Sequence, residues 1–90
     1  MEYQIKVSEE AEKDIVLTRC HYKALVQEKI FDKDFVTQIE FLKANPHMFQ
    51  IYYRNVRRIH FKNFLYLLHF VIENESVYIL RLLHQKQKFE

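Results

Sequence analysis

Three side chains that can bind an anion or move a proton occupy alternate positions in the later half of the chain: Arg58, His60 and Lys62. In an extended strand they share one face, and the apolar Ile59 and Phe61 occupy the other. Neighbours on such a face stand about 6.5–7 Å apart, close to the spacing of consecutive phosphates on a nucleic acid. Arg grips a phosphate with two hydrogen bonds, Lys adds a point charge, and His exchanges protons near neutral pH. The row therefore favours binding of a polyanion or an acidic protein segment. The alternative is a charged strand that only discourages edge-to-edge aggregation.

Further candidates lie near the C-terminus. Arg81 interrupts an apolar run, and because an unpaired buried charge is costly, it needs either an ion pair, such as one with a helix glutamate, or a ligand. His84 follows that run and could act as an acid, a base or a phosphate contact. The candidate catalytic residues are Arg58, His60, Lys62, Arg81 and His84. The candidate nucleic-acid or target-binding residues are Arg57, Arg58, Lys62, Lys86 and Lys88.

Other chemistries find little support in the residues present. The five histidines lack metal-ligand spacing, the single Cys20 excludes an intrachain disulfide, and the absence of glycine excludes a glycine-rich phosphate loop. We expect Cys20 to pack as a small apolar residue on a helix. No metal, cofactor or Ser-His-Asp arrangement is predicted. Catalysis, if there is any, would rest on basic groups, as in RNA cleavage through the 2′-hydroxyl.

Size and charge set broad limits. Ninety residues predict one domain, 1–90, and a net charge of +2 gives only weak overall attraction to nucleic acid. Basic residues nevertheless crowd the later half, which predicts a local basic surface. No basic-then-apolar leader or long apolar run is present, so we expect a cytoplasmic protein with no membrane partner.

The hydrophobic pattern predicts an α+β fold of the order β-α-α-β-β-β. Alternation over 3–7 indicates a strand, and Ser8 is a good N-cap for a helix to about Lys29. Asp32 is a second N-cap for a helix that Asn45-Pro46 stops. After a loop or short extended approach over 47–54, three strands are expected at 56–62, 64–72 and 76–83. Asn55, Asn63 and Asn74 stand at the turns, since without glycine a positive φ must use Asn or Asp. The two helices should form a hairpin packed on one side of a mostly antiparallel sheet.

This order of elements, with three segments in the later half, resembles the RelE/ParE superfamily of bacterial type II toxins over nearly the whole chain. The segments run from Tyr52 to Ile59, from Phe64 to Phe70 and from Val77 to His84. The resemblance implies a toxin that inhibits growth and a cognate antitoxin whose tail covers the working surface. It also implies a target, either DNA gyrase for ParE-like members or the ribosome and its mRNA for RelE-like members.

The two branches differ at positions that this chain can be compared with. Arg58, His60 and Lys62 match basic sheet positions of the RelE-like endoribonucleases. Tyr66, however, falls where that branch usually has Arg, and the run Phe64-Leu65-Tyr66 is closer to the ParE-like pattern. The ParE-like branch is therefore favoured, with the target left open. A non-toxic interaction module of the same fold, or a free nucleic-acid-binding domain, are the alternatives.

Overall fold

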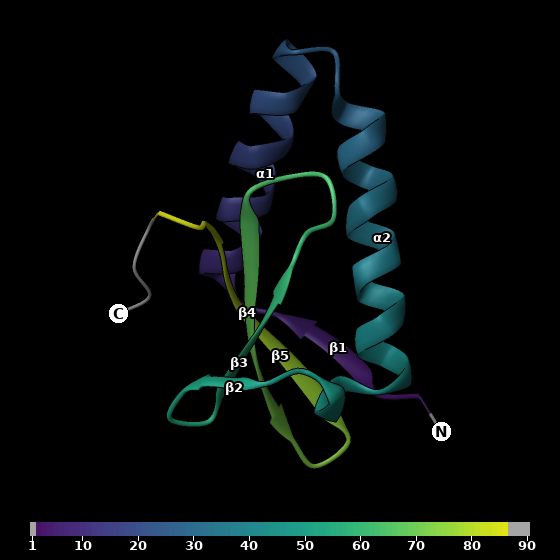
Figure 1. The fold of residues 1–90 in the computed structure, drawn as a ribbon, viewed down its shortest axis with the longest axis vertical. Helices are drawn as coiled ribbons and strands as arrows, with labels where there is room; N and C mark the ends of the chain where they lie inside the picture. The colour runs from purple at the N-terminus through teal and green to yellow at the C-terminus, as the bar shows by residue number, and fades with distance from the viewer. Residues whose placement is uncertain (1, 87–90) are drawn as a thin grey trace.

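The computed structural model describes residues 2–86, which form two helices and a five-stranded sheet (Figure 1). The elements in chain order are β1 Gln4–Val7, α1 Glu9–Ala24, α2 Glu28–Ala44, the short 3-10 helix η1 Pro46–Met48, β2 Ile51–Tyr53, β3 Val56–His60, β4 Tyr66–Glu73 and β5 Ser76–His84. The strand order across the sheet is β1-β5-β4-β3-β2, and only β1 and β5 run parallel. The predicted α+β class and the helical hairpin on a mostly antiparallel sheet are confirmed. Four strands follow the helices, one more than predicted, because 51–53 pairs with β3.

The helix boundaries confirm some sequence signals and correct others. Ser8 caps α1, since its Oγ accepts a hydrogen bond from the Ala11 N–H at 3.0 Å. The first helix ends at Ala24 rather than near Lys29. Asp32 is not a cap: it lies inside α2, where its carboxylate receives a two-pronged hydrogen bond from Arg19 of α1. The predicted stop before Pro46 is confirmed.

Positive φ angles fall at only one of the three expected asparagines. Asn74 has φ 57°, in the β4–β5 turn, whereas the β2–β3 turn uses Arg54 at φ 54°. Val26, between the helices, has φ 58°, which is strained for a β-branched residue. The left-handed turn that ends α1 imposes this angle, because the Val26 N–H donates to the Lys23 carbonyl and the Gln27 N–H donates to the Tyr22 carbonyl.

The core lies between the helical hairpin and the facing side of the sheet. Phe31 of α2 is at its centre and stacks on Tyr22 of α1 and Phe61, with ring centroids 5.6 and 5.7 Å apart. The buried apolar cluster consists of Ala11, Phe31, Leu42, Ile59, Phe61, Leu68, Phe70, Val77, Ile79 and Leu82. The central position of β4 and β5 is as predicted. Cys20 is exposed, so its predicted packing is wrong, because it falls on the solvent side of α1.

Candidate binding groove at the edge of β3

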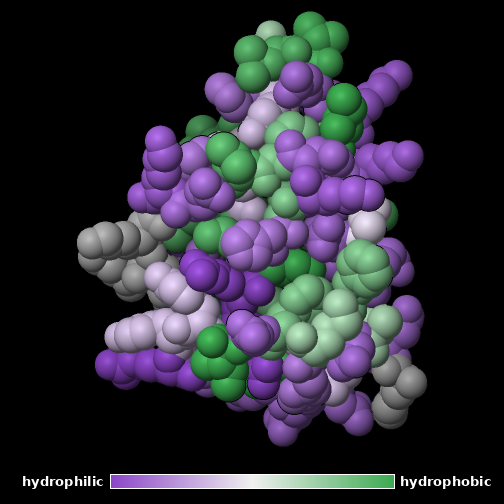
Figure 2. All heavy atoms as spheres, in the orientation of Figure 1, coloured by the Kyte–Doolittle hydropathy of each residue, from purple (hydrophilic) through white to green (hydrophobic). Residues whose placement is uncertain are grey.

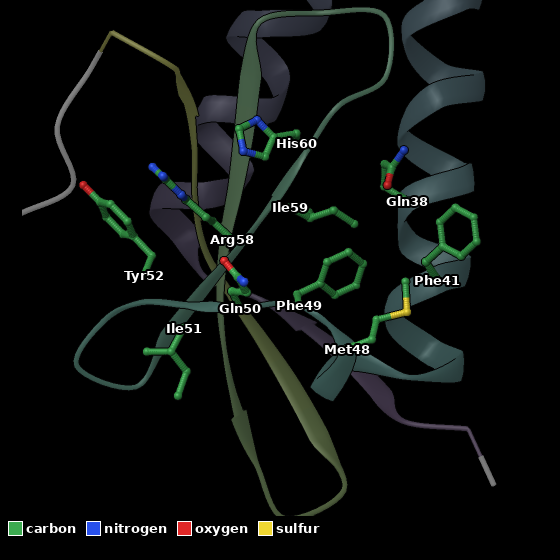
Figure 3. Close-up of a pocket in the computed structure, with 10 residues that line it drawn as sticks. All are labelled: Gln38, Phe41, Met48, Phe49, Gln50, Ile51, Tyr52, Arg58, Ile59 and His60. Atoms are coloured by element: carbon green, nitrogen blue, oxygen red, sulfur yellow. The ribbon is translucent and has the colours of Figure 1, made fainter.

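A groove lies between β3, the η1–β2 segment and the C-terminal half of α2. We call it the β3 groove, and its volume is about 590 Å³. Figure 3 shows Ile59 and Phe49 on one side of the hollow, facing Gln38, Phe41 and Met48. Its lining residues are Gln38, Phe41, Met48, Phe49, Gln50, Ile51, Tyr52, Arg58, Ile59 and His60. The lining thus combines an apolar interior with cationic and proton-carrying groups, and includes no carboxylate from the described part of the chain.

Arg58 is held at the groove by an aromatic neighbour. Its guanidinium carbon lies 3.9 Å from the ring centroid of Tyr52, a close cation–π contact, and Figure 3 shows the two side chains together. The Tyr52 ring meets His69 edge-on at 5.8 Å, and His69 pairs across the sheet with Arg58. Tyr52 therefore orders the Arg58 head group while leaving it accessible from the groove.

His69 is a buried group that the sequence did not identify. Only 2% of its surface is exposed, and it stands between Arg58 of β3 and Arg81 of β5 in the sheet register. Burial lowers the pKa of His69, because it disfavours the charged ring, and Arg58 adds repulsion. The ring is therefore a neutral spacer between two cations.

The predicted row of three cationic groups is only partly present on β3. Ile59 and Phe61 are buried, at 3% and 5% exposed, which confirms the inward half of the alternation. The strand ends at His60, however, two residues earlier than expected. Lys62 lies in the following bend and lines a separate depression beside α2, whereas Arg58 and His60 share the β3 groove.

Asp34 of α2 explains why the strand ends there. Its carboxylate accepts hydrogen bonds from the backbone N–H of Lys62 at 3.3 Å and of Asn63 at 2.9 Å. Gln38 donates a third at 3.2 Å, and Asp34 is only 4% exposed. A helix side chain thus replaces a strand as the partner of this backbone. Little in the sequence indicates this role. Asp34 lies two residues after Asp32, the expected N-cap, where an acidic residue is common in the first turn of a helix.

Arg57 points its guanidinium at the backbone before β2. Its Nη1 donates to the carbonyl oxygens of His47 and Phe49. These bonds fix the segment that supplies Met48, Phe49 and Gln50 to the groove. Its predicted role in target binding remains a prediction, but the guanidinium is already engaged within the fold.

Arg81 forms the ion pair that its position required. Its Nε lies 2.7 Å from Oδ2 of Asp14, and Nη2 lies 3.2 Å from Oδ1. The partner is a helix carboxylate, as considered from the sequence, although an aspartate rather than a glutamate. This hydrogen bonding raises the pKa of Arg81.

His84 and Lys86 lie apart from the groove. His84 pairs with Tyr66 across β4 and β5, their rings meet edge-on at 5.4 Å, and its Nδ1 accepts a bond from the Lys86 N–H. Lys86 is exposed, and Lys88 lies outside the described residues. The structure therefore brings Arg58 and His60 together and leaves Lys62, Arg81 and His84 elsewhere.

Within residues 2–86, no cluster of three or more His, Cys, Asp or Glu side chains could hold a metal ion. None of the helices in that range is long and apolar enough to cross a bilayer.

The fold, a helical hairpin packed on a mostly antiparallel sheet, has a counterpart among solved structures. A structure described as "Chromosomal ParDE TA system from P. aeruginosa" aligns with a TM-score of 0.72 and 22% identity. The alignment covers 89% of this chain and 92% of that one, and at this identity it establishes the fold alone. No curated protein sequence gives a match.

The sequence model described as "ParE toxin of type II toxin-antitoxin system, parDE" matches residues 5–89. The chain therefore belongs to the ParE toxin family of type II toxin–antitoxin systems, as the resemblance implied. Membership of this family implies an antitoxin as partner.

Proposed function

We propose that this ParE-family toxin inhibits growth by binding DNA gyrase, without cutting RNA, and that an antitoxin blocks it at the β3 groove. Gyrase is the target that resemblance to the ParE-like branch implies. The site of action would then be the cytoplasm. We favour the ParE-like over the RelE-like activity because the candidate catalytic side chains lie at separate places in the fold.

An RNA-cleaving site needs a proton acceptor and cations that converge on one phosphate. Here Arg81 is paired with Asp14, and Lys62 lines a different depression from Arg58 and His60. His84 packs against Tyr66 at the far end of β4 and β5. Arg58 and His60 remain as the pair available in the groove, which suits binding of an acidic surface better than catalysis.

The antitoxin assignment rests on charge and shape. The groove contains Arg58 and His60, and its floor exposes part of Phe41 and Met48 to solvent. An acidic and apolar segment that becomes ordered there buries apolar area and pairs its carboxylates with Arg58. Such a segment would neutralise a toxin that uses the same surface.

The experiment is inducible expression in bacteria followed by two assays with the purified protein. We expect growth arrest, loss of DNA supercoiling by purified gyrase, and no codon-phased cuts in primer extension on cellular mRNA. Codon-phased cuts with unaffected gyrase would assign the RelE-like activity instead. Unimpaired growth with both assays negative would leave only a non-toxic interaction module.

A further inference from the structure

The depression beside α2 lies apart from the β3 groove and is bordered by two elements. The loop between β3 and β4 runs next to the first half of α2, as Figure 1 shows, and the depression there has a volume of about 470 Å³. Its lining residues are Lys29, Ile30, Lys33, Asp34, Thr37, Lys62 and Asn63. The three lysines are all exposed, so basic side chains dominate this surface.

The other acidic residues of α2 do not neutralise these lysines. Glu28 and Asp32 lie 3.7 and 2.8 Å from the guanidinium of Arg19, on α1. Glu40 lies 3.7 Å from the ammonium of Lys43, one turn further along α2. No ion pair within residues 2–86 reaches any of the three lysines of the depression.

Asp34 is the only carboxylate in the described lining, and its oxygens are turned to other donors. Oδ1 accepts from the Lys62 N–H and from the Gln38 amide, and Oδ2 accepts from the Asn63 N–H. These bonds shield the carboxylate, which is 4% exposed, and they fix the loop that carries Lys62 against α2. Three lysines against one shielded acid give the depression a formal charge of +2, as large as that of the whole chain.

We propose that this depression binds the phosphate backbone of duplex DNA without reading the base sequence. Lys29 and Lys33 are one helical turn apart, so their Cβ atoms stand about 5–6 Å from each other. Two ammonium groups at that spacing can reach neighbouring phosphates of one strand, and Lys62 adds a third cation from the loop. The inference goes beyond the proposed function and does not depend on gyrase as the target.

The composition of the lining favours a phosphate backbone over an acidic protein surface. Lysine is depleted at protein interfaces, whereas aromatic residues, Met and Arg are enriched there. The β3 groove has the composition of a protein interface, since its lining includes Phe41, Met48, Tyr52 and Arg58. The depression beside α2 has lysines instead, with Ile30 as its only apolar residue among those described.

Single-stranded RNA is disfavoured by the absence of aromatic side chains. Unstacked bases are bound mainly by stacking on aromatic rings or on Arg guanidinium groups. The described lining of the depression contains neither, so nothing there holds a splayed base. Duplex DNA keeps its bases stacked and presents the phosphates that a lysine cluster can contact.

The test measures binding of a fluorescently labelled DNA duplex of about 20 base pairs by anisotropy, at salt concentrations from about 20 to 200 mM. The triple variant Lys29→Gln, Lys33→Gln, Lys62→Gln should bind about tenfold or more weakly at the lowest salt. Its plot of log K against log salt should flatten by about 2–3, since each phosphate contact contributes about 0.9 to the slope. Arginine at the same three positions keeps the charge and should retain binding.

A matched variant separates the site from the overall charge. Lys6→Gln, Lys13→Gln, Lys23→Gln makes the same change in net charge at exposed lysines of β1 and α1. We expect this variant to bind the duplex within about twofold of the unaltered protein and to keep its salt slope. Circular dichroism of each variant checks that the fold is retained.

Four results would overturn the inference. Equal loss of binding in the two glutamine variants would reduce the effect to overall charge, and no duplex binding at the lowest salt would remove the site. Displacement of the duplex by polyglutamate, charge for charge, would assign the depression to an acidic protein. Tighter binding of a single-stranded RNA of the same sequence would contradict the choice of DNA.

Failure of this inference is separable from failure of the proposed function. A protein that binds the duplex as expected but leaves growth and gyrase unaffected refutes the toxin assignment alone. A protein that arrests growth and inhibits gyrase but does not bind the duplex refutes the lysine site alone.

Discussion

Arg81 of β5 and Asp14 of α1, 67 positions apart in sequence, form a two-pronged ion pair with a shortest distance of 2.7 Å. Asp14 also accepts the backbone N–H of Leu82 at 3.1 Å. One carboxylate therefore serves both the Arg81 side chain and the backbone of β5 beyond the end of β1. This pair attaches α1 to the sheet.

Asp14→Ala should destabilise the fold, because it leaves the Leu82 N–H and the Arg81 guanidinium without this acceptor. We expect the free energy of unfolding to fall by about 1–3 kcal/mol. Urea denaturation measures the change, and Glu12→Ala, an exposed acid on the same helix, is the control. Equal stability of the two variants would mean that the ion pair contributes nothing.

Asp34→Ala should be more damaging than Asp32→Ala. Asp34 is buried and accepts three hydrogen bonds that hold the β3–β4 loop, so its loss should cost about 2–3 kcal/mol. Asp32 pairs with Arg19 on the surface, where solvent screens the ion pair, so its loss should cost much less than the loss of Asp34. Denaturation midpoints of the two variants should differ clearly, and the reverse ranking would contradict this account of the loop.

Val26→Gly should stabilise the protein. Val26 is 91% exposed at φ 58°, so the substitution relieves backbone strain and removes no buried contact (Figure 2 shows apolar side chains at the tip of the hairpin). Relief of the strain should raise the free energy of unfolding by about 1 kcal/mol. The greater entropy of glycine in the unfolded chain offsets part of this gain. The neighbouring Leu25→Gly, at φ −92°, should not stabilise. A lower thermal midpoint for Val26→Gly would show that the strain has been misjudged.

Stability should fall at acidic pH because of His69. Burial, and then Arg58, hold the pKa of folded His69 below its ordinary 6.5, although a backbone hydrogen bond with Leu67 acts in the opposite direction. The unfolded chain therefore takes up a proton first as pH falls below 6.5. The contribution of His69 to the free energy of unfolding is fully present above pH 6.5. Below that pH it decreases, by up to about 1.4 kcal/mol per pH unit, until the pH reaches the pKa of His69 in the folded protein.

Urea titrations at several pH values between about 5 and 8 measure this slope. His69→Gln, which keeps a polar side chain without the titration, should flatten it. An unchanged slope in the variant would assign the pH dependence to other groups.

Arg58→Ala combined with Lys62→Ala should reduce growth inhibition while the protein remains folded. The single variants separate the two sites, because Arg58 lines the β3 groove and Lys62 lines the depression beside α2. We expect most of the loss, about tenfold or more in the inducer needed for arrest, to come from Arg58. Full toxicity of the double variant would remove both residues from the mechanism.

Local sequence determined the class of the fold and much of its outline. Ser8 caps α1 through its own side chain, and Pro46 ends α2 through its effect on the preceding residue. The alternation that buries Ile59 and Phe61 could also be read directly, because strand periodicity is a property of adjacent residues. The resemblance to RelE/ParE toxins rested on the same order of elements and proved correct.

Tertiary structure decided what the cations do. Arg57, Arg58 and Arg81 look alike in sequence, yet one binds loop carbonyls, one stacks on Tyr52 at the groove, and one pairs with Asp14. Asp34 ends β3 from a helix 29 positions away from Asn63. Each of these contacts depends on a partner that only folding brings close. Residue type and spacing alone therefore could not predict the contact.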